Sequence, residues 1–409
     1  MKLNKFSVLN GLFISTSLLI ISPSILAYHG VASIDLKGLL DAAWMQSGAA
    51  SVFEQRKQAL VDKSEISRQF FPSSAEVGAS FDSDELFKDE GKREYALQIE
   101  TPIWLPGQQK ALSSEVGAEM SLLVAEEVAQ RWQLAGLVRE DYWAVMIARN
   151  DVKLAARKLE ISEKLVANVN KRVQAGELAE IDLLLSKQKK LATESELLSA
   201  NQLLAKAQLV FNGLAGRDAP EDWLSETEQS IPLEDHPMLV FISKQLTLNQ
   251  AGIEKIRSKK REAPRLGLGL KRERDYREED YQNSVGIEFI LPLENNVINK
   301  SDFAHSQAEK AAIEARYFRE KYKLEKSIEL AKLAVIHAEK SYEIAERLKV
   351  LAVKHFRLMQ NAFNIGEVGL RELLLVQNDS DRAVESSAQQ KVEVASAISR
   401  FNQEQGALL

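Results

Sequence analysis

Five charged residues follow shortly after two glycines, Gly176 and Gly366, and they are the side chains whose spacing suggests chemistry. They are Asp182, Arg371, Glu372, Asp379 and Asp381. Repeated around a symmetry axis, such carboxylates form an acidic ring that attracts cations. Arg371 is placed to pair with a neighbouring carboxylate. For any single member of this set, the alternative interpretation is a solvated helix face.

Catalytic and metal-binding chemistry is not indicated elsewhere in the chain. The sequence has no cysteine, which excludes disulfides, thiolate metal sites, cysteine nucleophiles and a lipidated N-terminal cysteine. The five histidines are too scattered for a helical zinc pair, and no nucleotide-binding loop or nucleophile elbow is present. We therefore expect no enzyme activity, no cofactor and no bound metal. His236 precedes Pro237 and is expected to cap a helix rather than to bind a ligand.

The two glycines belong to an internal repeat. The segment RVQAGELAEIDLLL at 172–185 aligns with FNIGEVGLRELLL at 363–375, and the same offset places Pro102 on Pro292. Each copy is a glycine break between two long helical patterns. The repeat therefore predicts two αα-hairpins, with turns at 175–181 and 365–371. The acidic residue six positions after each glycine falls in the first turn of the outgoing helix, where it meets the positive end of the helix dipole.

Each half also contains two segments in which apolar and polar residues alternate. Around Leu266, Leu268 and Leu270 the apolar residues alternate with small or charged ones. This period of two predicts strands. The four expected strands cover about 74–82, 93–101, 264–272 and 283–291. In each half two strands enclose a charged loop, which predicts a β-hairpin.

Long helices are expected in the two stretches that lack proline, from 107 to 219 and from 293 onward. Ala, Leu, Glu, Lys and Gln dominate both stretches, and these residues favour helix. The first incoming helix, about 68 residues long, would reach roughly 100 Å. Residues that recur every seven positions on the outgoing helix favour coiled-coil packing against a neighbour; they are Leu184, Leu191, Leu198 and Ala205.

Residues 1–27 have the pattern of a signal peptide. Lys2 and Lys5 precede an apolar core, and Ala27 precedes the expected cleavage point. The core is shorter than the roughly 20 residues of a spanning helix, although an uncleaved anchor is the alternative. The rest of the chain divides into repeat 1, residues 28–222, and repeat 2, residues 223–409.

These features predict a mostly α fold with a small β part, built from two tandem repeats that each contain a β-hairpin and a long α-hairpin. Four strands cannot close a barrel, and an open sheet edge is not tolerated in lipid. If these strands lie in a membrane, several chains must share one barrel, and three chains would supply 12 strands. The helices would then form a tube whose far end carries the glycine turns.

Resemblance to a known family points the same way. The two turn segments and the junctions LQIETPIWLPG at 97–107 and IEFILPL at 287–293 resemble the TolC-like outer-membrane efflux family over essentially the whole mature chain. Two further segments, WLPGQQK at 104–110 and LAGLVREDYW at 134–143, resemble its cobalt–zinc–cadmium-type heavy-metal branch. The resemblance implies a homotrimer, with a trimeric α-barrel in the periplasm and a shared 12-stranded β-barrel in the lipid of the outer membrane.

The same resemblance implies partners. In that family the helical turns meet the hairpins of a periplasmic adaptor, which links the channel to an inner-membrane pump such as a resistance-nodulation-division transporter. Carried onto this chain, it implies adaptor contact at the periplasmic tip by Ala175, Gly176, Leu178, Ile181, Gly366, Val368 and Leu370. The small residues allow another helix to approach closely, and the larger ones offer apolar contact. The alternative is that these residues only cap and pack the chain's own hairpins.

The implied function is that of the outer-membrane channel component of a tripartite efflux system, a passive trimeric conduit for divalent metal ions. One alternative is an outer-membrane channel for drug efflux or type I protein secretion. Another is a periplasmic coiled-coil adaptor or structural protein, but two equal halves with a strand pair each argue against an adaptor. A net charge of −6 and the lack of a basic stretch interleaved with aromatics give no reason to expect a nucleic-acid-binding protein.

Overall fold

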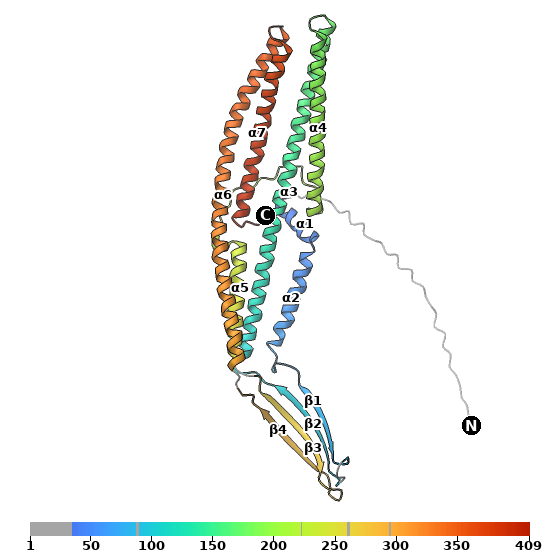
Figure 1. Ribbon diagram of the computed structural model, residues 1–409, viewed down its shortest axis with the longest axis vertical. Helices are drawn as coiled ribbons and strands as arrows, with labels where there is room; N and C mark the ends of the chain where they lie inside the picture. The colour runs from blue at the N-terminus through green and yellow to red at the C-terminus, as the bar shows by residue number, and fades with distance from the viewer. Residues whose placement is uncertain (1–34, 87–89, 222, 260–261, 294–295) are drawn as a thin grey trace, which may run out of the picture. The chain divides into compact units, whose positions relative to one another are not determined.

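The computed structural model describes residues 35–409 except 87–89, 222, 260–261 and 294–295. The predicted signal peptide at 1–27 lies outside the described residues. Long helices and one small sheet make up the described part (Figure 1), so the predicted mostly α fold with a small β part is confirmed. In chain order the elements are α1 (Leu36–Gln46), α2 (Ala49–Ile66), β1 (Glu76–Ser83), β2 (Arg93–Pro102), α3 (Gln108–Gln174), α4 (Glu180–Ala215), η1 (Leu233–Asp235), α5 (Pro237–Ser258), β3 (Arg265–Arg274), β4 (Gln282–Ile290), α6 (Asn296–Asn364) and α7 (Leu370–Glu404).

The four strands form one antiparallel sheet in the order β1-β2-β3-β4. One row of its register crosses all four strands through Val77, Ile99, Leu268 and Ile287. Because side chains alternate between the two faces of a sheet, rows of this kind gather apolar side chains on one face. Within the described chain, β1 and β4 each pair on one side only, so both outer edges of the sheet are open.

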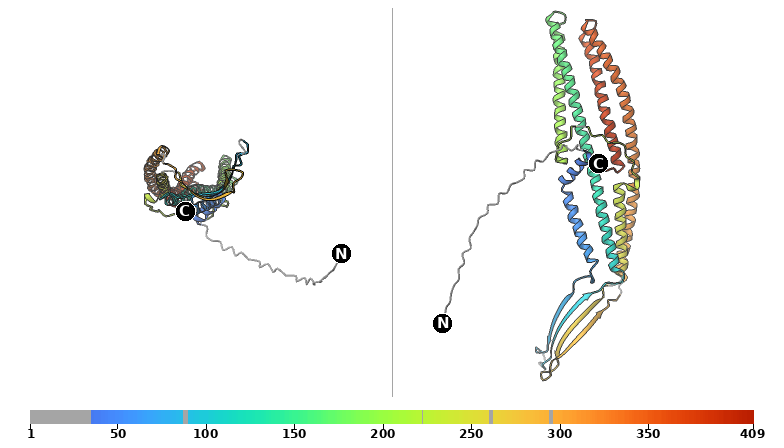
Figure 2. Two further views of the ribbon diagram at one scale, coloured as in Figure 1. Left: turned by 90° about the horizontal axis from the view of Figure 1, so that it is seen from below. Right: turned by 180° about the vertical axis from the view of Figure 1, so that it is seen from behind.

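Two pairs of long helices dominate the rest of residues 35–409, α3 with α4 and α6 with α7. Helix α5 packs against both α3 and α6, whereas α1 and α2 pack against α3. The sheet lies at one end of these helices and both interhelical turns lie at the other (Figure 1, Figure 2). The helices run without a break because no proline interrupts them. Across the described ranges, none of the helices combines the length and apolarity that a membrane crossing requires.

The core is centred on the middle of α3. Val138, Tyr142 and Val145 are fully buried there. Next to them, Trp143 meets Trp223 edge to face, with ring centroids 5.3 Å apart. Trp223 lies in the polar connector between α4 and α5, so this contact holds the connector against α3.

A buried ion pair joins the same connector to α3 and to the C-terminal segment. The guanidinium of Arg139 donates two hydrogen bonds to the carboxylate of Glu226, at 3.1 and 2.8 Å, and a third to the carbonyl of Ala407 at 3.0 Å. Ser399 and Asn402 donate to the same carboxylate. Because both charges are buried, their hydrogen bonds must be satisfied within the protein. The pair therefore fixes three distant segments in one arrangement.

His236 caps α5, as predicted. Its Nδ1 accepts a hydrogen bond from the N–H of Met238 at 3.2 Å, and its ring meets the Trp132 ring edge to face, with centroids 4.8 Å apart. Burial lowers the pKa of His236 to about 4. The ring is therefore neutral at ordinary pH, which leaves Nδ1 free to accept.

Replacing the buried arginine tests the importance of this joint. Arg139→Ala leaves the Glu226 carboxylate buried without its cation, so we expect a loss of about 3–5 kcal/mol in the free energy of unfolding. The control is Arg56→Ala, because Arg56 makes a similar two-bond pair with Glu126 on the surface. Exposed pairs contribute about 0–1 kcal/mol. Thermal unfolding followed by circular dichroism checks the difference, and equal losses in the two variants would contradict it.

Candidate functional site

Both helical turns are closed by the same hydrogen-bond pattern. In the first turn, the N–H of Gly176 donates to the carbonyl of Val173 at 3.0 Å, and the N–H of Glu177 donates to that of Arg172 at 2.8 Å. The equivalent bonds around Gly366 measure 3.1 and 2.9 Å. Gly176 and Gly366 have φ angles of +79° and +84°, a left-handed conformation that glycine adopts without strain. These are Schellman-type ends of α3 and α6.

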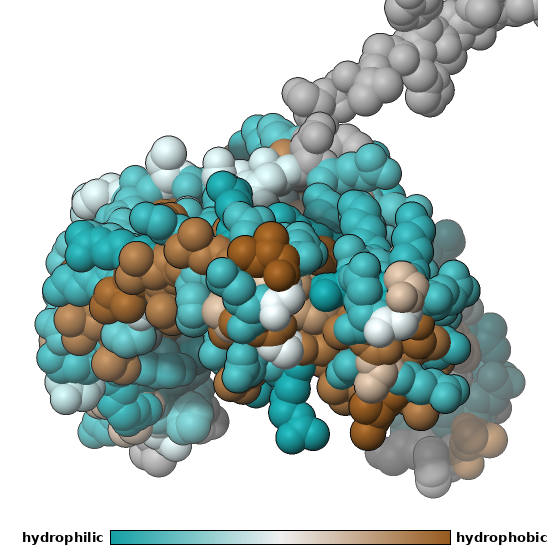
Figure 3. All heavy atoms as spheres, turned by 90° about the horizontal axis from the view of Figure 1, so that it is seen from above, coloured by the Kyte–Doolittle hydropathy of each residue, from teal (hydrophilic) through white to brown (hydrophobic). Residues whose placement is uncertain are grey.

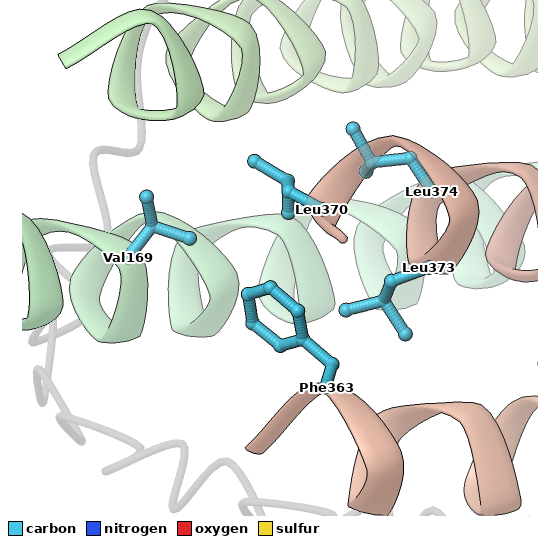
Figure 4. Close-up of a cluster of buried hydrophobic side chains, with 5 residues drawn as sticks. All are labelled: Val169, Phe363, Leu370, Leu373 and Leu374. Atoms are coloured by element: carbon cyan, nitrogen blue, oxygen red, sulfur yellow. The ribbon is translucent and has the colours of Figure 1, made fainter. Parts of the chain in front are cut away.

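A buried hydrophobic cluster lies beneath the turns and joins the two α-hairpins (Figure 4). Its side chains point toward one another from three helices: Val169 from α3, Phe363 from α6, and Leu370, Leu373 and Leu374 from α7. Burying such a side chain contributes about 1.5–3 kcal/mol. The two turns are therefore held together by packing rather than left as separate loops.

Arg172 adds a polar contact at the same place. Its guanidinium lies over the ring of Phe363, 4.8 Å from the centroid, and donates to the carbonyl of Phe363 at 2.9 Å. It also donates to the carboxylate of Glu177 at 3.0 Å. One side chain thus connects the first turn to the end of α6. Sequence reasoning missed this role, since Arg172 and Phe363 are far apart in the chain and neither side chain shows by its spacing that they meet.

The seven residues predicted to contact an adaptor fall into two groups. Those exposed at the turns are Ala175, Gly176, Ile181 and Gly366. Nothing lies within 4 Å of where a Cβ would stand on either glycine, so both turns leave room for another backbone. Those packed against the buried cluster are Leu178, Val368 and Leu370, and Leu370 is only 2% exposed. Ile365, which the sequence reading did not select, is 72% exposed beside Gly366.

The five charged residues predicted from the sequence also differ in their exposure. Arg371, Glu372 and Asp379 are exposed on α7, and Asp182 is half-buried in the first turn of α4. Asp381 lies deeper. Burial raises the pKa of Asp381, and the positive charges of Lys189 and Lys158 oppose this shift.

Asp381 belongs to a polar seam between α7 and the α3–α4 hairpin. Lys158 on α3 pairs with Glu385 on α7 at 2.9 Å and with Glu196 on α4 at 3.4 Å. Lys189 on α4 donates to the side-chain carbonyl of Asn378 on α7 at 2.7 Å. The seam joins the two α-hairpins farther from the turns than the hydrophobic cluster does. The repeat pattern in the sequence did not predict it.

Next to the turns, a hollow of about 640 Å³ separates α4 from α7. Apolar and charged side chains share its lining: Leu185, Leu374, Leu375, Lys189, Arg371 and Glu372. Viewed from the end of the molecule that carries the turns, hydrophobic patches lie between hydrophilic ones (Figure 3). In the described parts of the chain, no group of three or more His, Asp or Glu side chains is arranged to hold a metal ion.

Two further apolar surfaces are uncovered. On α4, the heptad residues Leu184, Leu191 and Leu198 are all exposed. A second exposed row with a spacing of seven was not noticed in the sequence. It runs along α6 into the turn that follows and consists of Ile344, Leu351, Leu358 and Ile365. Neither row is covered by another element of the described chain.

The apolar face of the sheet is likewise exposed. Its rows contain Leu266 and Phe289; Val77, Ile99, Leu268 and Ile287; and Ala79, Leu97, Leu270 and Val285. The opposite face carries Glu100, Gln98, Lys271, Glu94 and Glu273 with glycines and serines. The sheet is thus amphipathic, and no element of the described chain covers its apolar side.

Known proteins resemble this chain in sequence and in fold. No family model matches the chain. A curated relative, the cobalt-zinc-cadmium resistance protein CzcC of Cupriavidus metallidurans, is 24% identical over 233 residues, which is 54% of this chain. The match spans 55% of the relative's length, so it covers about half of each protein.

Solved structures match over nearly the whole length. CusC, described as forming a transmembrane channel, superposes with a TM-score of 0.72 at 14% identity, covering 91% of this chain and 93% of CusC. The outer membrane protein VceC of Vibrio cholerae gives 0.71 at 13% identity, covering 91% and 96%. The chain has the fold of the TolC-like channels. The resemblance inferred from the turn segments is therefore confirmed, and this likeness supports the prediction that the chain is not an enzyme.

The two turn glycines can be tested in this TolC-like fold. Alanine at position 176 or 366 must adopt a left-handed backbone, which costs about 1–2 kcal/mol. We expect Gly176→Ala and Gly366→Ala to lower the melting temperature measured by circular dichroism. The control, Gly117→Ala, adds a methyl group to an exposed glycine within α3 where nothing lies within 4 Å. It should stabilise the helix by up to about 1 kcal/mol. Destabilisation by all three changes would contradict the argument.

The half-buried carboxyl of Asp381 predicts a pH-dependent effect. Burial favours its protonated form in the folded protein, so its folded pKa exceeds its unfolded value. Above both pKa values the folded state bears the full cost of the buried charge, and below both it bears none. Asp381→Asn should therefore raise the melting temperature at neutral pH, and the gain should shrink as the pH falls through the raised folded pKa and disappear below the ordinary value of 3.8. The exposed Asp379→Asn is the control, and a gain that grows toward acid pH would contradict the argument.

Proposed function

We propose that this protein is the outer-membrane channel component of a tripartite efflux system. Three copies form a passive conduit that carries divalent metal ions out of the cell, and the energy comes from an inner-membrane pump. The observation that carries the proposal is the sheet: an amphipathic four-stranded sheet with two open edges, at the opposite end of the long helices from the turns. The outer membrane is the proposed location of the sheet, and the periplasm that of the helices.

The dimensions of the sheet support insertion in a membrane. Its strands have 8 to 10 residues, and at roughly 3.3 Å per residue they are about as long as the apolar band of an outer-membrane barrel is tall. Aromatic residues flank the apolar rows. Phe81 and Tyr95 lie at the loop end, and Phe70 and Trp104 lie near the helical end. Such aromatic girdles mark both interfaces of outer-membrane barrels.

The open edges of the sheet support assembly with further copies of the chain. In lipid, unpaired backbone N–H and C=O groups cost several kcal/mol each, so a sheet must close on itself. Pairing β1 of one copy with β4 of the next satisfies both edges, and three copies give a shared 12-stranded barrel. The exposed heptad rows on α4 and α6 provide matching contacts for a trimeric α-barrel, because apolar residues at this spacing pack helix against helix.

The turns suit contact with a periplasmic adaptor. Ala175, Gly176 and Gly366 leave open space, and Ile181 offers an exposed apolar side chain. Leu178, Val368 and Leu370 support these positions from beneath, since they pack on the buried cluster. We assign the direct contact to the exposed residues and place the adaptor, linked to a resistance-nodulation-division pump, at this tip.

The charges near the turns suit a cation entrance. Three copies would repeat Asp182, Glu372 and Asp379 around the axis, with Arg371 paired to a neighbouring carboxylate so that the entrance stays narrow. Carboxylate rings attract cations without binding them tightly. Divalent metals are the proposed cargo because the curated relative is named for cobalt, zinc and cadmium resistance. Drug efflux or type I protein secretion is the second candidate function. The likeness to CusC and VceC extends only to the fold, so it does not identify the cargo.

Disrupting one heptad row tests the trimer. Leu191→Glu combined with Leu198→Glu places charges at a helix contact where each buried leucine contributes about 1.5–3 kcal/mol. We expect the variant to lose the trimer and run as a monomer in native mass spectrometry of the detergent-solubilised protein. Met45→Glu is the control, since Met45 is similarly exposed but lies off both rows. A trimer that survives the double change would contradict the proposed contact.

Cargo is tested in a deletion strain. Loss of the gene should increase sensitivity to zinc, cobalt and cadmium while tolerance to a panel of drugs and detergents stays unchanged, and the intact gene should restore growth. Sensitivity to organic compounds alone would overturn the metal assignment and keep the channel. Release of the protein from membranes by high salt would instead overturn the channel and favour a periplasmic adaptor or structural protein.

A further inference from the structure

At its loop end, the apolar face of the sheet carries charged and polar side chains. There the register runs through Phe81, Tyr95, Arg272 and Asn283, and in the next row Arg93 lies opposite Arg274. These positions continue the same face as the apolar rows, because they are separated from them by even numbers of residues along each strand. Three arginines therefore stand on the apolar side of the sheet, next to the apolar rows.

Aromatic rings hold two of these arginines in place. The guanidinium groups of Arg272 and Arg274 lie 4.6 and 4.9 Å from the centroid of the Tyr281 ring. That ring is 6.3 Å from the ring of Tyr95, which is 4.9 Å from the ring of Phe81. Cation–π stacking orients a guanidinium while leaving its N–H edge available for hydrogen bonds. The arrangement is thus a built surface rather than a chance group of flexible side chains.

The positive charge of this group is not balanced within the described residues. Arg93 has one carboxylate near it, that of the exposed Glu85 at 3.5 Å. Neither Arg272 nor Arg274 forms an ion pair with any carboxylate that the structure describes. The acidic side chains in the row between these two, Glu94 and Glu273, point to the opposite face, where Lys271 pairs with both. Like charges held this close favour an anion between them.

We propose that Arg93, Arg272 and Arg274 form a binding site for the phosphate groups of an anionic lipid. The proposal rests on the proposed function, because it takes the apolar rows as the surface that faces the acyl chains. A lipid lying along this surface would place its acyl chains on Leu97, Leu270 and Val285. Its phosphate would then meet the arginines at the loop end. Arginine suits this ligand, since its planar group forms two parallel hydrogen bonds with phosphate oxygens.

The test removes two arginines and keeps the rest of the sheet. The full-length protein carrying Arg272→Gln and Arg274→Gln is compared with a control carrying Arg265→Gln and Lys271→Gln. The control loses the same charge from the same strand, but both of its residues lie on the opposite face. The probe is diphosphorylated lipid A in detergent micelles, with phosphatidylcholine and inorganic phosphate as separate comparisons. Bound lipid is counted by native mass spectrometry across a titration.

Two readouts keep this inference separate from the proposed function. Flotation of each variant with outer-membrane vesicles reports on insertion, and the titration reports on the headgroup site. We expect wild type, variant and control all to float, and the arginine variant alone to bind lipid A about 10- to 30-fold more weakly. Equal lipid A binding by all three proteins would overturn the site while leaving the channel intact. Competition by inorganic phosphate as strong as by lipid A would identify a free anion and overturn the lipid assignment. Failure of the wild type to float would overturn the proposed function, and the lipid site with it.

Discussion

The open edges of the sheet are the constraint on which the rest of the structure depends. Strands β1 and β4 each leave one row of backbone N–H and C=O groups without a partner in the described chain. Water can satisfy such groups, but lipid cannot. A chain with an amphipathic sheet of this kind therefore needs other copies of itself if the sheet is to lie in a membrane. The exposed heptad rows on α4 and α6 have the same implication for the helices, since both rows are apolar and uncovered.

The two halves of the chain share a plan but differ in packing. Helix α7 carries a long series of buried residues and packs against α3 as well as α6, whereas α4 buries few side chains and packs mainly on α3. The hydrophobic cluster and Arg172 tie the two turns together near the tip. Farther from the tip, hydrogen bonds and ion pairs join α7 to the α3–α4 hairpin. The two α-hairpins therefore lie in different environments.

The sequence predicted the elements well because their signals are local. Alternation around Leu266, Leu268 and Leu270 corresponds to β3, and the glycine breaks correspond to left-handed turns. Helix capping by His236 follows from its position before Pro237. What the sequence did not reveal depends on how helices are rotated against one another. Leu370 is buried and Ile365 exposed although both flank the same turn, and Asp381 faces a polar seam while Asp379 faces solvent. The Arg139–Glu226 pair was missed because its partners are 87 positions apart and nothing in their spacing links them.

The uncovered apolar rows on α4 and α6 link the stability of the chain to its assembly. On the proposed trimer these rows are covered by other copies, so the chain would gain part of its stability by mass action, and folding and assembly would become one concentration-dependent equilibrium. Before assembly, the same surfaces are exposed and favour aggregation. On the trimer proposed here, the lifetime of the unassembled chain, rather than the strength of any contact within it, would then limit how much functional protein a cell accumulates.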